Sequence, residues 1–248
     1  MNYIACDVII GYPRVIDDAL AKDTSDLLGE MDRLGIDSAI VRHESALWAG
    51  PQVGNQKLLE DIRGQKRLMP AYFVTPDGFE PEFSPALMVE QMLAHGSYTC
   101  WCDPKAELFS IQPWCSAELY AILQERRIPL MLDYTKISPD DLHIVLSEFA
   151  ELRIIVLNAP RLGRNRMLYP LLRRHANLYL CLSNTYSVHL GYEDLCTTFG
   201  HERWVFGMGY PGAEPGAAIA GLMYADLSDE AKQAIARANI ERLLGEVR

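Results

Sequence analysis

Carboxylate and imidazole side chains stand at the carboxyl ends of several predicted strands in this chain. Asp7 and Asp133 occupy two of these ends, and His43 occupies a third. A carboxylate can donate or accept a proton or bind a hard divalent cation, and a histidine can exchange a proton near neutral pH. Asp7, His43 and Asp133 are therefore the candidate catalytic residues.

The sequence leaves two roles open for Asp7. An ionised carboxylate that faces the interior of a fold is costly unless it is paired or bound to a metal. One role is a buried ion pair with Arg42 or Arg161, and the other is a metal-binding or acid–base role shared with Asp133. If the two carboxylates lie close together, one should have a raised pKa unless a cation sits between them. For His43, a packed, hydrogen-bonded histidine is the alternative to a general acid or base.

A second group of residues is suited to binding a substrate. Arg161 and Arg164 precede a predicted helix, where positive charge opposes the helix dipole, so an anion is expected nearby. That anion would be a substrate carboxylate or phosphate, or an acidic subunit surface, and a solvated loop is the alternative. Trp101, Asp103 and Asn158 stand at other strand ends, where Trp101 forms either a pocket wall or part of the core. We expect a small anionic substrate.

Strand-like and helix-like segments alternate along the whole chain and would position these residues. The expected strands are Tyr3–Ile10, Ser38–Arg42, Met69–Thr75, Tyr98–Cys102, Pro129–Leu132, Ile154–Leu157, Leu178–Leu182 and Trp204–Phe206. The expected helices lie near 24–34, 55–63, 85–95, 116–126, 139–150, 165–175, 191–199 and 228–245. This alternation predicts parallel strands with right-handed crossovers.

Eight such units predict a (β/α)8 TIM barrel, as a single domain over residues 1–248. No GxGxxG motif follows the first strand, which disfavours an open dinucleotide-binding sheet. In a barrel the chemistry takes place at the carboxyl ends of the strands, where the candidate residues stand.

Composition excludes several classes of partner. The net charge of −10 and the pI near 5.1 disfavour a nucleic-acid or anionic membrane surface. We find no apolar run long enough to cross a membrane and no basic leader before the first strand, so we expect a cytoplasmic protein. The six cysteines contain no CxxC pair, which fits reduced thiols rather than a zinc site.

The C-terminal part of the chain carries a specific pattern. FGHERWVFGMGYP reads as a strand that runs into a loop, and a helix follows that begins near Ser228 and ends at Gly245. The segment resembles the last strand and closing helix of the amidohydrolase-related family, which typically reads GxxRxxFGSDxP and then NxxRLLG. The matching residues are Gly200, Arg203, Phe206, Gly207, Tyr210, Pro211, Asn239, Arg242, Leu243, Leu244 and Gly245.

The resemblance also locates the family's metal-binding positions, and all of them differ here. Asp7 and Ile9 stand where the family has two histidines on its first strand, and Asp133 and Asn158 stand where it has two more. Gly209 replaces the family's aspartate. Oxygen ligands on Asp7 and Asp133 favour Mg²⁺ or Ca²⁺ over Zn²⁺. We therefore expect no cofactor, or one weakly bound divalent cation.

The resemblance implies a small-molecule hydrolase or decarboxylase that forms a homodimer. Two hypotheses remain. The first is an atypical enzyme that uses Asp7, His43 and Asp133 on a small anionic substrate, and the second is a barrel that has lost catalysis and binds a ligand or protein partner. Convergence of the three residues in one open pocket would favour the enzyme.

Overall fold

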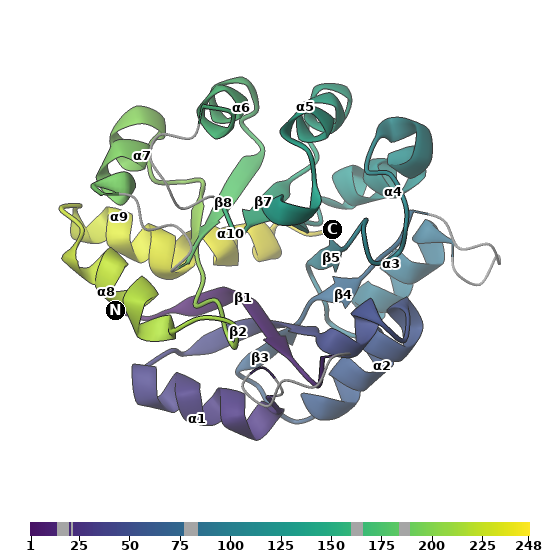
Figure 1. Cartoon of the computed structure of the whole chain (residues 1–248), viewed down its shortest axis with the longest axis horizontal. Coiled ribbons are helices and arrows are strands. Elements are labelled where there is room, and N and C mark those ends of the chain that lie inside the picture. The colour runs from purple at the N-terminus through teal and green to yellow at the C-terminus, as the bar shows by residue number, and fades with distance from the viewer. Residues whose placement is uncertain (14–19, 21, 77–83, 160–165, 184–188) are drawn as a thin grey trace.

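A computed structural model describes residues 1–13, 20, 22–76, 84–159, 166–183 and 189–248. Helices surround the strands in the view of Figure 1. The strands are β1 (Ile4–Ile10), β2 (Ser38–His43), β3 (Leu68–Pro70), β4 (Tyr72–Phe73), β5 (Cys100–Cys102), β6 (Leu130–Asp133), β7 (Ile154–Leu157), β8 (Leu178–Leu182) and β9 (Trp204–Phe206). Every pairing between these strands is parallel.

Several of the helices begin at residues suited to that position. The helices are α1 (Thr24–Leu34), α2 (Pro51–Asp61), α3 (Pro85–Ala94), α4 (Pro113–Arg126), α5 (Pro139–Glu148), α6 (Leu168–Arg174), α7 (Gly191–Phe199), α8 (Pro215–Tyr224), α9 (Asp229–Gln233) and α10 (Asn239–Gly245). A π-helical turn, Ala234–Ala238, joins the last two. Proline at the first position of α2 to α5 costs no hydrogen bond, because that amide has no partner within a helix. None of the described helices is long and apolar enough to cross a membrane.

The strands form two hydrogen-bonded groups, β1 to β3 and β4 to β9, that together close a barrel. The expected strand Met69–Thr75 is divided between them. The amide of Ala71 donates to Val41 on β2 (2.9 Å), whereas the amide of Tyr72 donates to Thr99 before β5 (3.2 Å). At the other junction between the two groups of strands, the amide of Ile9 on β1 donates to the main-chain oxygen of Tyr210, just beyond β9 (3.1 Å). The predicted single-domain (β/α)8 barrel is confirmed.

The strands separate two apolar layers. Side chains that include Phe73, Met131 and Val205 fill the barrel interior, and a larger set packs between the strands and the helices. Each strand supplies both layers because successive side chains point to opposite faces. The apolar character of both faces is typical of parallel strands covered by helices.

A β-bulge in β1 changes which residues face the interior. The pairing register with β2 shifts between Ala5 and Val8, so two residues of β1, Cys6 and Asp7, lie opposite one residue of β2, Ile40. Cys6 therefore faces inward, as do Asp7 and Ile9, while Val8 packs in the outer layer. The expectation that Asp7 and Ile9 share one face agrees with the structure.

Candidate active site

A cavity of about 290 Å³ opens at the carboxyl ends of the strands. Six of the nine strands, or the residues just beyond them, line the cavity, namely β1, β2, β5, β6, β7 and β9. The lining residues are Asp7, Ile9, Arg42, Leu47, Trp101, Cys102, Asp103, Met131, Asp133, Lys136, Asn158, Gly209, Tyr210, Gly212 and Ala213.

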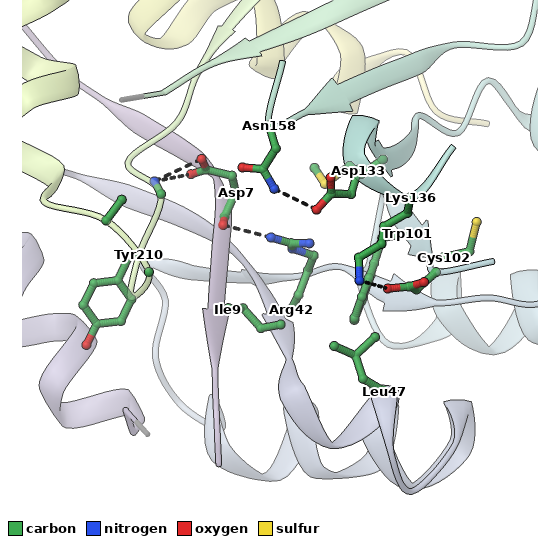
Figure 2. Close-up of a pocket in the computed structure, with 15 residues that line it drawn as sticks. Asp7, Ile9, Arg42, Leu47, Trp101, Cys102, Asp133, Lys136, Asn158 and Tyr210 are labelled. Carbon is green, nitrogen blue, oxygen red and sulfur yellow. Dashed lines mark hydrogen bonds and ion pairs between the residues drawn. The ribbon is translucent and has the colours of Figure 1, made fainter. Parts of the chain in front are cut away.

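Arg42 stands at the centre of this cavity. Figure 2 shows its guanidinium between Asp7 and Asp133, and the guanidinium carbon lies 5.2 Å from the centre of the Trp101 ring. Nη2 donates to the main-chain oxygen of Asp7 (3.0 Å), whereas Nε is buried and has no hydrogen-bond partner among the described residues. Burial lowers the pKa of Arg42, and the charges of Asp7 and Asp133 oppose that change. The site thus contains a cation of its own.

Asp7 is buried against the loop that follows β9. Its Oδ1 accepts the amides of Met208 (2.7 Å) and Gly209 (3.0 Å), and Oδ2 also lies 3.0 Å from the amide of Gly209. A Cβ atom on Gly207 would come within 2.6 Å of Oδ2, so the close approach requires glycine there. Burial raises the pKa of Asp7, while the two amides and the charge of Arg42 act in the opposite direction. The carboxyl group therefore keeps its proton to a higher pH than an exposed aspartate.

Asp133 is held by hydrogen bonds from the loop that follows β6 and from Asn158 after β7. Its Oδ1 accepts the amide (2.8 Å) and hydroxyl (2.7 Å) of Thr135, and Oδ2 accepts the side-chain amide of Asn158 (2.7 Å). Asn158 has a φ of 53°, a left-handed conformation that asparagine tolerates better than most residues. Asp133 and Asn158 therefore position each other at the cavity wall.

The predicted residues at the carboxyl end of β5, Trp101 and Asp103, also line the cavity. Trp101 donates from Nε1 to Ala71 (3.2 Å), which fixes the ring that Arg42 overlies. Asp103 accepts two amides of its own turn, and its Oδ2 lies 3.6 Å from Nζ of Lys136. The Lys136 side chain is 40% exposed, so its ammonium group stands where the cavity meets solvent.

The structure does not bring all three candidate catalytic residues together. Asp7 and Asp133 line the same cavity, but His43 lies on the opposite face of β2 and lines a different cavity. The ring of His43 is buried between Ser45 and Asp61. Arg161 and Arg164 lie outside the described residues. Convergence therefore holds for the two carboxylates and not for the histidine.

Sequence reasoning missed Lys136 and Tyr210, and it treated Arg42 only as a structural partner. A charged residue in the otherwise apolar strand SAIVRH was the available signal for Arg42, because such a charge requires partners. Lys136 and Tyr210 lie in loops, and no pattern in the sequence indicates which loop side chains reach the cavity. The pKa of Tyr210 is raised by burial and by the neighbouring acidic residues of α1 and its cap.

The divalent metal implied by the resemblance can be tested against these side chains. Within the described ranges, no group of three or more His, Cys, Asp or Glu side chains is placed to hold a metal ion. Asp7 already accepts two amides, and Asp133 accepts Thr135 and Asn158. The Arg42 guanidinium would repel a second cation placed between the carboxylates. The described residues do not fit a tightly bound divalent metal.

Comparison with known proteins identifies the family. The model of the amidohydrolase family matches residues 102–245. The chain belongs to the amidohydrolase family. No curated protein matches this chain at a significant level.

Solved structures resemble this chain over nearly its whole length. An uncharacterised TIM-barrel protein from Bordetella bronchiseptica is 17% identical, with a TM-score of 0.73 and 99% of each chain covered. A dihydroxybenzoic acid decarboxylase from Polaromonas, with bound manganese and the inhibitor 2-nitroresorcinol, is 13% identical (TM-score 0.74; 99% of this chain and 97% of that one). A 5-carboxyvanillate decarboxylase from Sphingomonas paucimobilis is 12% identical (TM-score 0.71; 100% and 99%). At these identities the similarity establishes the fold.

Proposed function

We propose that this member of the amidohydrolase family is an enzyme that hydrolyses or decarboxylates a small organic carboxylate, and that Arg42 supplies the cation of its active site. The single observation that carries the proposal is the guanidinium between Asp7 and Asp133 at the centre of the strand-end cavity. A guanidinium is planar, keeps its charge, and binds carboxylates through two parallel hydrogen bonds.

The walls of the cavity suit a compact, partly apolar anion. Ile9, Leu47, Met131 and the Trp101 ring provide apolar surface, and Lys136 adds a second positive charge at the opening. A volume of about 290 Å³ accommodates a small molecule. The named substrates of the Polaromonas and Sphingomonas relatives also bear carboxylate groups on a ring.

Asp7 is the proposed proton donor. Its raised pKa favours the protonated form at a higher pH than usual, and it lines the cavity beside Arg42. Hydrolysis requires a proton for the leaving group, and decarboxylation requires one for the carbon that loses CO₂. One acid at this position therefore serves either reaction.

Binding without catalysis is the second candidate function. It is favoured by the contacts of Asp7, whose two oxygens are both occupied by the amides of Met208 and Gly209. In that case Arg42 and Trp101 would bind a carboxylate ligand without turning it over. As for cofactors, we propose that the protein uses no metal or, at most, a weakly bound divalent cation.

The test is a panel of ring carboxylates that begins with 2,6-dihydroxybenzoate and 5-carboxyvanillate, offered to chelator-treated protein. Binding is measured by calorimetry and product formation by mass spectrometry. We expect at least one compound to bind and turn over, and Arg42→Met to weaken its binding by about 100-fold, the loss of a charged hydrogen-bonded contact. Arg237→Met, which removes a surface arginine paired with Glu241, is the matched control.

Each result separates the two candidates. Binding without product supports the binding protein. Activity that appears only after Mn²⁺ is added back, or binding that Arg42→Met leaves unchanged, would overturn the assignment of Arg42 as the active-site cation.

A further inference from the structure

A second cavity, of about 630 Å³, lies outside the barrel between the ends of β1 and β2 and the helices α1 and α2. It shares no lining residue with the active-site cavity. Its lining residues are Gly11, Tyr12, Asp23, Thr24, Ser25, His43, Ser45, Trp48, Val53, Lys57 and Asp61.

A serine, a histidine and an aspartate are in hydrogen-bond contact on the wall of this cavity. Nδ1 of His43 lies 2.7 Å from Oγ of Ser45, and Nε2 lies 3.2 Å from Oδ2 of Asp61. The amide of Ser45 also donates to Nδ1 (3.1 Å), so Nδ1 is an acceptor and Nε2 carries the proton in the neutral ring. The Ser45 hydroxyl then donates to Nδ1, and the Nε2–H group donates to Asp61.

Capping of the short helix Glu44–Leu47 explains only part of this arrangement. His43 caps that helix by accepting the Ser45 amide, which requires neither the Ser45 hydroxyl nor Asp61. The backbone at Gly11 also closes on the His43 ring, because a Cβ atom there would lie 2.5 Å from Cε1. The ring is therefore fixed between its two partners by packing as well as by hydrogen bonds.

Asp61 occupies an unfavourable position for a carboxylate. It is the last residue of α2, where the helix dipole disfavours negative charge. Lys57 pairs with Oδ1 (2.8 Å), which leaves Oδ2 directed at His43. Asp61 therefore combines with His43 as the carboxylate does in nucleophile–base–acid triads, where it orients the imidazole and stabilises its charged form.

We propose that Ser45, His43 and Asp61 form a second reactive site, in which Ser45 is acylated by esters of small apolar or aromatic acids. Ser45 Oγ attacks the acyl carbon, its proton passes to Nδ1 of His43, and the alcohol leaves with that proton. Water repeats the sequence, releasing the acid and restoring Ser45. Tyr12, Trp48 and Val53 are 66%, 50% and 53% exposed, so they offer apolar surface to the acyl group.

Two further features suit this chemistry. Burial lowers the pKa of His43, against the opposing effect of Asp61, so the ring is a neutral base at pH 7. The charged and titratable groups around it are Asp61 and Lys57 of α2, Asp23 at the start of α1 and Tyr12 after β1. Thr24 and Ser25 also line the cavity, and first-turn amides have no acceptor within the helix. The main-chain amides of Thr24 and Ser25 are therefore the candidate donors to the oxyanion that forms when Ser45 attacks the acyl carbon.

The experiment is labelling with a fluorophosphonate probe, followed by intact-mass and peptide mass spectrometry. We expect one adduct, on Ser45, and none in Ser45→Ala. Ser147→Ala is the matched control, because Ser147 lies 3.4 Å from Nδ1 of His143 but that histidine contacts His175 rather than a carboxylate. Ser147→Ala should label as wild type does.

A second variant keeps the proposal testable if Ser45→Ala fails to fold. Asp61→Asn retains an oxygen for Nε2–H and should slow labelling by about 100-fold or more. The rate should also fall on acidification with a midpoint below about pH 6.5, the ordinary histidine value. No adduct on Ser45 under conditions that label a known serine hydrolase, or a rate independent of Asp61 and of pH, would overturn the proposal.

Discussion

Arg42 and His43 are neighbours in the sequence but belong to different cavities. They are the last two residues of β2, and the alternation of the strand directs Arg42 into the barrel mouth and His43 outward toward α1 and α2. Both are basic residues whose pKa is lowered by burial. One strand end therefore supplies a basic side chain to each of two separate sites.

The difference between the two side chains decides what each site can do. A guanidinium starts from a pKa far above neutrality, so Arg42 keeps its charge despite burial and can hold an anion. The ordinary pKa of an imidazole is near 6.5, so a pKa lowered by burial leaves His43 neutral at pH 7 and able to accept a proton. Burial thus gives an anion-binding group on one face of β2 and a base on the other.

Removing the Arg42 charge should give the largest difference between the responses of the two sites. Arg42→Met leaves Asp7 and Asp133 without the cation between them, and losing one partner of a buried charge group costs about 3–5 kcal/mol. We expect a drop of that size in the free energy of unfolding, measured in urea at pH 7. Fluorophosphonate labelling of the protein that remains folded should be unchanged. Coupled loss of labelling would show that the two cavities act as one unit.

The barrel could be predicted from the sequence because strand and helix patterns alternate without interruption. The expected strand Ile154–Leu157 and helix 24–34 match β7 and α1 in both bounds. The division of Met69–Thr75 into β3 and β4 was not foreseen. It depends on hydrogen bonds to strands on either side, which no local pattern encodes.

The site was only partly predictable for a different reason. The motifs indicated that Asp7 and Asp133 lie near each other, and the two residues share a cavity. His43 was a candidate only because it stands at a predicted strand end, with a packed, hydrogen-bonded histidine as the alternative, and it lines a different cavity. A strand that is apolar on both faces, such as SAIVRH, gives no sign of which face is inward. The bulge that turns Asp7 into the barrel beside Cys6 is likewise invisible in the sequence. The existence of these strands could be predicted, but the sequence does not show which of their alternating side chains face the barrel interior.

A glycine substitution tests how closely the inner site is packed. Gly207→Ala would place a Cβ atom 2.5 Å from Sγ of Cys181 and 2.6 Å from Oδ2 of Asp7. We expect a loss of about 1–3 kcal/mol in the free energy of unfolding, the usual cost of overpacking. Gly29→Ala is the control, because its Cβ would meet nothing within 4 Å on the exposed face of α1. That change should stabilise the protein by about 0.5–1 kcal/mol. Equal effects at the two positions would contradict the packing of Asp7 against Gly207.

The smallest expected effect is the pH dependence that Asp7 contributes. Repulsion between Asp7 and Asp133 was the expected cause of a raised pKa at one of the two carboxylates, whereas in the structure the pKa of Asp7 is raised by burial. Between the ordinary Asp value, about 3.9, and the raised value, the native state binds more protons than the unfolded chain. Stability from this group is therefore present at low pH and lost as pH rises through that window.

Asp7→Asn removes this titration. Relative to the variant, the wild-type protein should lose stability as pH rises from about 4, by about 1.4 kcal/mol for each unit between the two pKa values. Urea unfolding from pH 4 to pH 8 measures the difference, with Asp226→Asn as a control for an exposed carboxylate. A wild-type advantage that instead grows with pH would mean that Arg42 and the amides of Met208 and Gly209 outweigh burial. Asp7 would then be a structural anion, and the proton donor would have to be sought elsewhere in the cavity.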